Sequence, residues 1–126
     1  MNNTDNSEQS WRQLIEKFPN VFRKLKHIEA PLGWFTIIHN LCEKLEPIFK
    51  NYPEVYAGQI KEKFGGLRFY VDSLYTIESE VNRNHIESLI QHAEEEAYAT
   101  CDVCGKPGEM HNFKGQYATL CNQHKF

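Results

Sequence analysis

Three cysteines and one histidine near the C-terminal end carry the clearest chemical pattern in the chain. Cys101 and Cys104 are separated by two residues, as are Cys121 and His124, and sixteen residues lie between the two pairs. Two intervening residues let both side chains of a pair point at one ion, and four such donors complete the tetrahedral shell of structural Zn²⁺. The spacing predicts a structural zinc site with Cys101, Cys104, Cys121 and His124 as ligands.

The segment that carries these pairs is too small for an apolar core of its own. A hairpin is expected around Lys114 and Gly115, and zinc would supply much of the folding free energy of residues 101–126. The alternative is three reduced structural thiols beside a coincidental histidine, and iron is less favoured than zinc for this donor set. Cys42 lies apart, on the apolar side of an expected helix, where a thiol usually acts as a small hydrophobic residue.

Zinc enzymes with similar Cys pairs fit the pattern poorly. Zinc deaminases need a proline before the first Cys pair and a separate His-x-Glu segment, whereas His85 begins such a segment only on the helix that leads into Cys101. HNH-type nucleases need a ββα core between their pairs, and sixteen residues with only His111 are too few. The chain also contains no nucleophile-elbow, Walker or His-Glu-x-x-His motif. We therefore favour a non-enzymatic role.

The second informative stretch is QIKEKFGGLRFYV at residues 59–71. Adjacent glycines between two β-prone runs are typical of a hairpin with a two-residue loop, expected here at Gly65 and Gly66, with Phe64 opposite Leu67. A phosphate-binding loop would need a helix directly after the glycines, and an RNA-recognition motif needs a different order of elements. The stretch is predicted to be the core of a β-hairpin over residues 55–71.

Alternation along this hairpin predicts one apolar face and one polar face. The apolar face, which would pack on the core, consists of Ile60, Phe64, Leu67, Phe69 and Val71, with Glu62 as the exception. The polar face consists of Gln59, Lys61, Lys63, Arg68, Tyr70 and Asp72. These polar residues are either the solubilising side of a half-exposed sheet or a ligand-binding face. In the second case the cations would hold phosphates and the tyrosine would stack on a ring.

Helices must position the two Cys/His pairs and the hairpin of residues 55–71. Apolar residues recur at helical spacing from a capping pattern at Ser10 to Phe18, over residues 34–49, and from residue 77 to about residue 100. Pro19 is expected to kink the first helix or to start another, and the Glu94–Glu96 run is expected to be solvated.

The predicted fold class is α+β, with long helices packed on a small antiparallel sheet and a C-terminal zinc-knuckle hairpin. Residues 1–9 are expected to be a disordered tail and residues 10–100 a helical domain that contains the hairpin. Residues 101–126 are expected to form the zinc-binding module packed on it.

Length, charge and cysteine content indicate the number of domains and the cellular compartment of the protein. The 126 residues suggest one domain, and the net charge of −3 gives no global basic field for nucleic acid. The polar start has no apolar run of a signal peptide, and no segment has the roughly 18 apolar residues of a membrane span. Four cysteines without a secretory signal favour metal ligation over disulfides. These features predict a cytoplasmic protein.

Three segments resemble a family of small, uncharacterised proteins that are common in bacteriophages and prophages. The segments are GWFTIIHNLCEKLEP, QIKEKFGGLRFYV, and CDVCGKPG followed by YATLCNQH, and they cover residues 30–126. Many relatives have Gly-Trp before the TLC segment where this chain has Gln116 and Tyr117, so an aromatic residue is retained. The resemblance implies a viral or mobile-element genome and a bacterial or infected-host cytoplasm, and it brings no activity.

Together these observations predict a non-enzymatic, zinc-stabilised binding protein of phage type. Its partner would be a host or defence protein, or a small anionic ligand such as a nucleotide. A nucleic-acid-binding regulator that uses the zinc module and the basic hairpin face is the alternative. A metal-dependent nuclease is a weaker alternative. The pattern predicts no oligomeric state.

Overall fold

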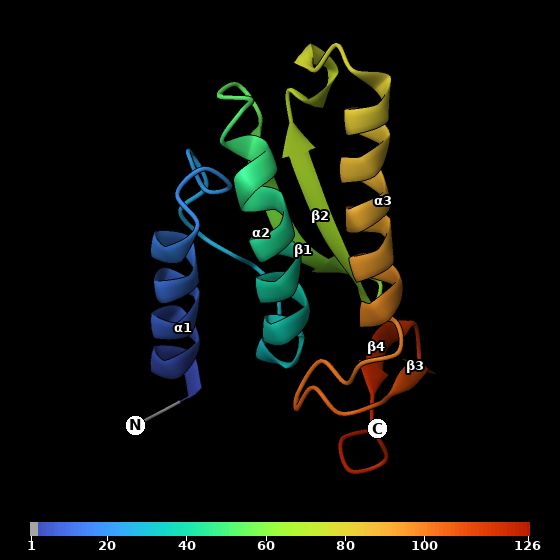
Figure 1. Cartoon of the computed structure of the whole chain (residues 1–126). Coiled ribbons are helices and arrows are strands. Elements are labelled where there is room, and N and C mark those ends of the chain that lie inside the picture. The colour runs from blue at the N-terminus through green and yellow to red at the C-terminus, as the bar shows by residue number, and fades with distance from the viewer. Residues whose placement is uncertain (1–2) are drawn as a thin grey trace.

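The computed structural model describes residues 3–126 and has an α+β architecture (Figure 1). The helices are α1 (Asn3–Lys17), α2 (Phe35–Phe49) and α3 (Glu80–Ala97), with 3₁₀ turns η1 (Leu32–Trp34) and η2 (Leu74–Thr76). The strands are β1 (Tyr56–Lys63), β2 (Gly66–Asp72), β3 (Glu109–Phe113) and β4 (Gln116–Leu120). β1 pairs with β2 and β3 with β4, both antiparallel.

The helices and the β1–β2 hairpin enclose the main core. In Figure 1, α2 lies between α1 and α3, the β1–β2 hairpin runs behind α2 and beside α3, and the β3–β4 hairpin lies at the C-terminal end of α3. The largest fully buried side chains include Trp34, Phe49, Ile60, Leu67 and Ile86. A separate small cluster forms around Cys101, Leu120 and Cys121. No helix within residues 3–126 is long and apolar enough to cross a membrane.

Helix α1 begins earlier than the sequence predicts. It starts at Asn3, so most of the segment expected to be a disordered tail is helical, and Ser10 lies inside the helix instead of capping it. The segment from Asn3 to Ser10 contains neither glycine nor proline, so nothing in it interrupts helical hydrogen bonding. Trp11 and Leu14, on the turns of the helix that follow this segment, are buried in the core.

Pro19 neither kinks α1 nor starts another helix. α1 ends at Lys17, and the chain continues through turns. The Glu46 carboxylate of α2 accepts hydrogen bonds from the backbone N–H groups of Asn20 and Val21, each at 3.0 Å. A side chain of α2 therefore satisfies donors that would otherwise have needed a continuing helix.

Helix α3 begins at its serine cap and not at the first apolar residue of the predicted stripe. The Ser79 side chain accepts a hydrogen bond from the Asn82 N–H at 3.2 Å. Ile77 precedes the helix yet is only 1% exposed, whereas Val81, the next large apolar residue of the predicted helical stripe, is 76% exposed. The buried residues of the helix are Ile86, Ala93 and Ala97, so these carry its core-facing side.

The loop of the β1–β2 hairpin lies one residue earlier than predicted. Its central residues are Phe64 and Gly65, with φ of 51° and 82°, as a type I′ turn requires. Phe64 therefore projects from the loop, and Leu67 pairs with Glu62 instead. Gly66 is needed for a different reason, because a Cβ atom there would lie 2.4 Å from Cζ of Tyr98.

The predicted division of the hairpin into two faces survives this change for the residues within the strands. Moving the loop by one residue moves the pairing by two, so each strand residue keeps its face. Gln59 lies opposite Tyr70 and Lys61 opposite Arg68, and cross-strand partners share a face. Ile60, Leu67 and Phe69 are buried on the other face. Phe64 is the exception, because it belongs to the loop.

Glu94 closes the free edge of β2, contrary to the prediction that it is only solvated. Its carboxylate accepts a hydrogen bond from the backbone N–H of Phe69 at 2.9 Å. On the outer edge of β1, the N–H of Glu29 donates to the Ile60 carbonyl at 2.9 Å. Both edges of the small sheet are thus partly protected from pairing with another chain.

Glu94→Ala is expected to lower the free energy of unfolding by about 1–3 kcal/mol, because a partly buried N–H loses a charged acceptor. Glu95→Ala is the matched control: Glu95 is exposed on the same helix and its carboxylate accepts a hydrogen bond from the exposed Gln91 side chain, so its loss should change stability by less than about 0.5 kcal/mol. Urea unfolding of both variants measures the difference. Equal losses would show that Glu94 does not hold the β2 edge.

Candidate metal centre

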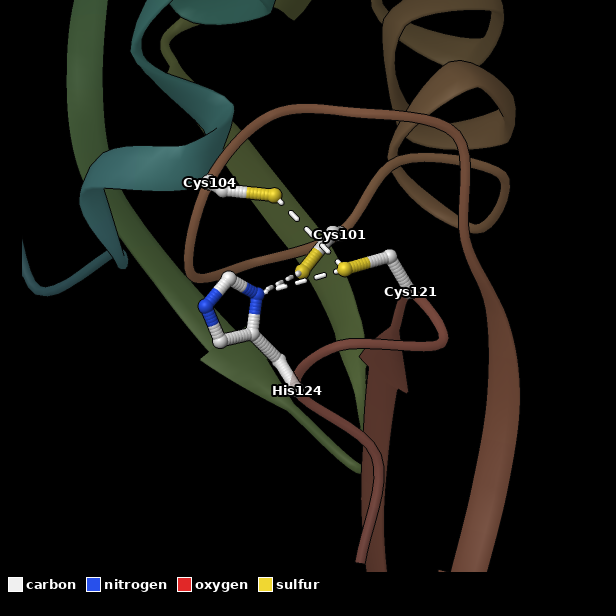
Figure 2. Close-up of side chains that lie close together, drawn as sticks. All are labelled: Cys101, Cys104, Cys121 and His124. Carbon is white, nitrogen blue, oxygen red and sulfur yellow. Dashed lines mark hydrogen bonds between the residues drawn. The ribbon is translucent and has the colours of Figure 1, made fainter.

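The four predicted ligands converge on one point at the C-terminal end of α3. Cys101 and Cys104 lie in the turn that follows α3, Cys121 follows β4, and His124 lies in the next turn. Their sulfur and ring nitrogen atoms all lie within 4.8 Å of one another. Figure 2 shows the side chains directed toward a common centre, with Nδ1 of His124 facing the sulfurs of Cys101 and Cys121.

Two of the distances between donor atoms are close to those of a tetrahedral shell. Zn–S bonds of about 2.3 Å and a Zn–N bond of about 2.0–2.1 Å at tetrahedral angles would place two sulfurs about 3.8 Å apart and sulfur and nitrogen about 3.6 Å apart. The Sγ atoms of Cys104 and Cys121 are 3.7 Å apart, and Sγ of Cys101 lies 3.6 Å from Nδ1 of His124. Sγ of Cys121 is closer to that nitrogen, at 3.2 Å. This group could hold a metal ion.

Tight turns give each pair its geometry. The N–H of Gly105 donates to the Cys101 carbonyl at 2.9 Å, and Gly105 has φ of 81°, which favours glycine. The N–H of Cys101 donates to the Lys106 carbonyl at 2.7 Å, which closes the first turn. In the second turn, the N–H of His124 donates to the Cys121 carbonyl at 3.1 Å. The turns formed by the local sequence therefore orient the side chains of both pairs toward one point.

The electrostatics of the cluster favour thiolates where the ligands are buried. Burial alone would raise the pKa of Cys101, but backbone N–H groups, led by that of Cys104, and the His124 ring lower this pKa to about 6. The backbone N–H of Lys106 lowers the pKa of Cys104, but burial and the neighbouring sulfurs outweigh it and raise that pKa. Crowded thiolates repel one another, and a divalent cation would relieve this repulsion.

The centre lies at the boundary between the interior and solvent. Cys101 and Cys121 are buried, whereas Cys104 and His124 are exposed. Leu120 and the half-buried Ala118 pack against the buried pair. One side of the cluster is therefore shielded from water, while the other remains open for an ion to enter.

Gly33 and Trp34 dock the Cys101–Cys104 turn on the helical part of the molecule. The N–H of Gly33 donates to the Asp102 carbonyl at 2.9 Å, and the indole N–H of Trp34 donates to the Thr100 carbonyl at 3.0 Å. A Cβ atom at Gly33 would lie 2.2 Å from the Cys101 carbonyl oxygen. Residues 34–49 were expected to be helical, and nothing in the local sequence indicated that Gly33 or Trp34 contacts the Cys101–Cys104 turn.

The β3–β4 hairpin docks on the tip of the β1–β2 hairpin. The Thr119 hydroxyl is buried and donates to the Gly65 carbonyl at 2.8 Å. The rings of Phe64 and Tyr117 meet nearly at right angles, with centroids 6.3 Å apart. The β3–β4 turn lies at Lys114 and Gly115, where the sequence places it, with φ of 53° and 87°.

Not all residues of the predicted ligand face are exposed and free of hydrogen bonds to the rest of the protein. Lys63 and Tyr70 are exposed, while Gln59 and Lys61 are half-buried. Arg68 donates to the Tyr98 hydroxyl and to the Leu67 carbonyl, both at 3.1 Å, so it links β2 to the end of α3. The exposed Glu29 pairs with Lys61 through the backbone and adds an acidic group to this face.

Two other residues considered in the sequence lie outside the metal cluster. His111 is half-buried on β3, opposite Ala118. Cys42 is fully buried in α2, where burial and then the nearby Glu46 carboxylate raise its pKa, so it remains a neutral thiol. This agrees with its expected role as a small hydrophobic residue.

No protein-family model, curated protein or solved structure matches the chain. The class of the protein therefore follows from its own fold and site. It is an α+β protein in which the turns on either side of the C-terminal hairpin provide a Cys₃His group that could hold a metal ion.

Proposed function

We propose that the chain is a zinc-stabilised binding protein without a catalytic centre. One observation carries the proposal: four protein donor atoms from two tight turns lie within 4.8 Å of one another, close enough to share one ion. Three thiolates and an imidazole favour zinc among the divalent metals. A catalytic zinc keeps one position for water, whereas His124 would occupy the fourth position here. The metal would therefore act in folding.

Zinc would supply folding free energy that the C-terminal segment lacks. In β3, Glu109, Met110, Asn112 and Phe113 are exposed, and the apolar cluster of the segment centres on Cys101, Leu120 and Cys121. Small metal-binding modules of this kind obtain much of their stability from the ion. By fixing the two turns, the ion would hold Thr119 against the carbonyl of Gly65 and so support the tip of the β1–β2 hairpin.

The ligand in this proposal is anionic and binds the polar face of the β1–β2 hairpin. The whole chain has a net charge of −3, so cations gathered on one face do not simply reflect the composition. Lys61 and Lys63 lie on the same face of β1, next to Gln59 and Tyr70. The proposed setting is the cytoplasm of an infected bacterium, where a host or defence protein is the other candidate partner.

Thermal-shift measurements on the full, zinc-loaded chain test this function. Inorganic pyrophosphate should raise the melting temperature of the parent protein, and the double variant Lys61→Glu, Lys63→Glu should lose this shift. Lys44→Glu, an exposed charge reversal on α2, is the control and should keep it. No shift in the parent would contradict the anionic ligand. Turnover of nucleotides or nucleic acid that depends on His111 or on zinc would contradict the non-catalytic role.

A further inference from the structure

Phe64 combines a strained backbone with an exposed aromatic side chain. It occupies the first central position of the type I′ turn with φ of 51°, where asparagine, aspartate and glycine are preferred. A bulky residue with positive φ is an outlier, and such strain often marks a functional position. Phe64 is also 65% exposed, so burial does not explain its presence.

A second exposed ring completes an aromatic corner at the hairpin tip. Tyr117 of β4 is 43% exposed, and its ring meets that of Phe64 at 88°. The two rings come from hairpins far apart in the sequence, and the docking of Thr119 on Gly65 holds these hairpins together. The corner therefore depends on the folded C-terminal hairpin, and it leaves much of both rings open to a planar ligand.

Cations accompany the corner. The Lys63 ammonium lies 5.7 Å from the centroid of the Phe64 ring. Lys61 follows on the same face of β1, and the 44% exposed Tyr70 lies further along β2. Exposed aromatic rings interspersed with cations are typical of surfaces that bind single-stranded nucleic acid, where rings stack on bases and cations contact phosphates.

We infer that this surface binds single-stranded nucleic acid, with bases on Phe64 and Tyr117 and phosphates on Lys63 and Lys61. The inference rests on the proposed function and names its ligand. Paired bases within a duplex cannot stack on side chains in this way. Protein interfaces deplete lysine at their centres, whereas here a lysine lies over the exposed ring. A mononucleotide would leave Tyr70 and one of the two lysines unused.

Fluorescence anisotropy with a labelled oligothymidine of about ten nucleotides tests the inference, since small single-strand sites span roughly 4–16 nucleotides. The zinc-loaded full chain should bind it, and two neutralised phosphates should make the affinity fall about sevenfold between about 50 and about 200 mM salt. Phe64→Asn introduces a residue that the turn prefers, so zinc content should be unchanged while affinity falls about 5- to 150-fold. Tyr117→Leu should weaken binding similarly.

Tyr75→Asn is the matched control, because Tyr75 is 84% exposed in η2, outside both hairpins, and its loss should leave affinity unchanged. The inference is overturned if the parent binds no more tightly than about 100 µM, if Phe64→Asn and Tyr75→Asn bind alike, or if thymidine monophosphate binds as well as the oligomer. If pyrophosphate still produces its lysine-dependent thermal shift in these cases, only this inference fails. Zinc-dependent turnover of the oligomer would instead contradict the proposed function.

Discussion

Cys101→Ser is expected to abolish tight zinc binding and to unfold residues 101–126, while the helices and the β1–β2 hairpin remain folded. Cys101 is fully buried and belongs to both the ligand group and the small apolar cluster of the C-terminal segment. Zinc binding contributes about 10–16 kcal/mol of apparent free energy in zinc-finger peptides. The loss of one buried thiolate should remove a large share of that term, and the segment has little apolar surface to replace it.

Two-dimensional amide NMR spectra would locate the effect. In the variant, signals of residues 101–126 should collapse toward random-coil shifts, while those of the core should persist, and a chelator should produce the same change in the parent. Cys42→Ala is the control, because Cys42 lies in the core and outside the cluster, so zinc should remain bound. A variant that keeps ordered β3 and β4 signals without zinc would show that the metal is dispensable for this segment.

Gly33→Ala is expected to lower the free energy of unfolding by about 3 kcal/mol and to weaken zinc binding, although Gly33 is not a ligand. An added Cβ atom would lie 2.2 Å from the Cys101 carbonyl oxygen and 2.3 Å from the Asp102 carbonyl carbon. Overpacking usually costs about 1–3 kcal/mol, and the upper end is expected because these are backbone atoms that cannot rotate away. Movement of Cys101 would also disturb the turn closed by Gly105.

Gly115→Ala separates this steric effect from ordinary glycine replacement. A Cβ atom at Gly115 meets nothing within 4 Å in the described part of the chain, but its φ of 87° is unfavourable for alanine. The expected cost is about 1 kcal/mol, with no change in zinc affinity. Urea unfolding at saturating zinc and competition with a chromophoric chelator measure both quantities. An equal cost in the two variants, with zinc affinity intact in Gly33→Ala, would contradict the docking role of Gly33.

Local patterns were sufficient to predict which four side chains converge into a group that could hold a metal ion. The two residues within each pair set the turn geometry, so the identity of Cys101 and Cys104, and of Cys121 and His124, follows from spacing alone. The β3–β4 turn at Lys114 and Gly115 was predictable for the same reason. Such features depend on neighbours in the sequence and need no knowledge of the rest of the fold.

The β1–β2 hairpin shows where local reasoning fails. Two adjacent glycines suggested a Gly65–Gly66 loop, yet Gly66 is a strand residue that makes room for the ring of Tyr98. That requirement comes from the end of α3, which the local pattern does not contain. The two faces were still predicted correctly within the strands, because a two-residue shift in pairing preserves alternation.

Tertiary contacts account for the pairings that the sequence did not reveal. Gly33 contacts the Cys101–Cys104 turn, Glu94 closes the β2 edge, and Tyr117 meets Phe64. Each pair is distant in the chain, and each residue has an ordinary local role as a connector, a solvated charge or a strand position. Their importance follows from which surfaces the fold brings together.

X-ray absorption at the zinc edge, on protein purified without added metal, tests the central claim most directly. The account predicts one zinc per chain, bound by three sulfurs at about 2.3 Å and one nitrogen at about 2.0–2.1 Å, from Cys101, Cys104, Cys121 and His124. Folded protein that contains no zinc, or zinc held mainly by oxygen atoms, would contradict the account.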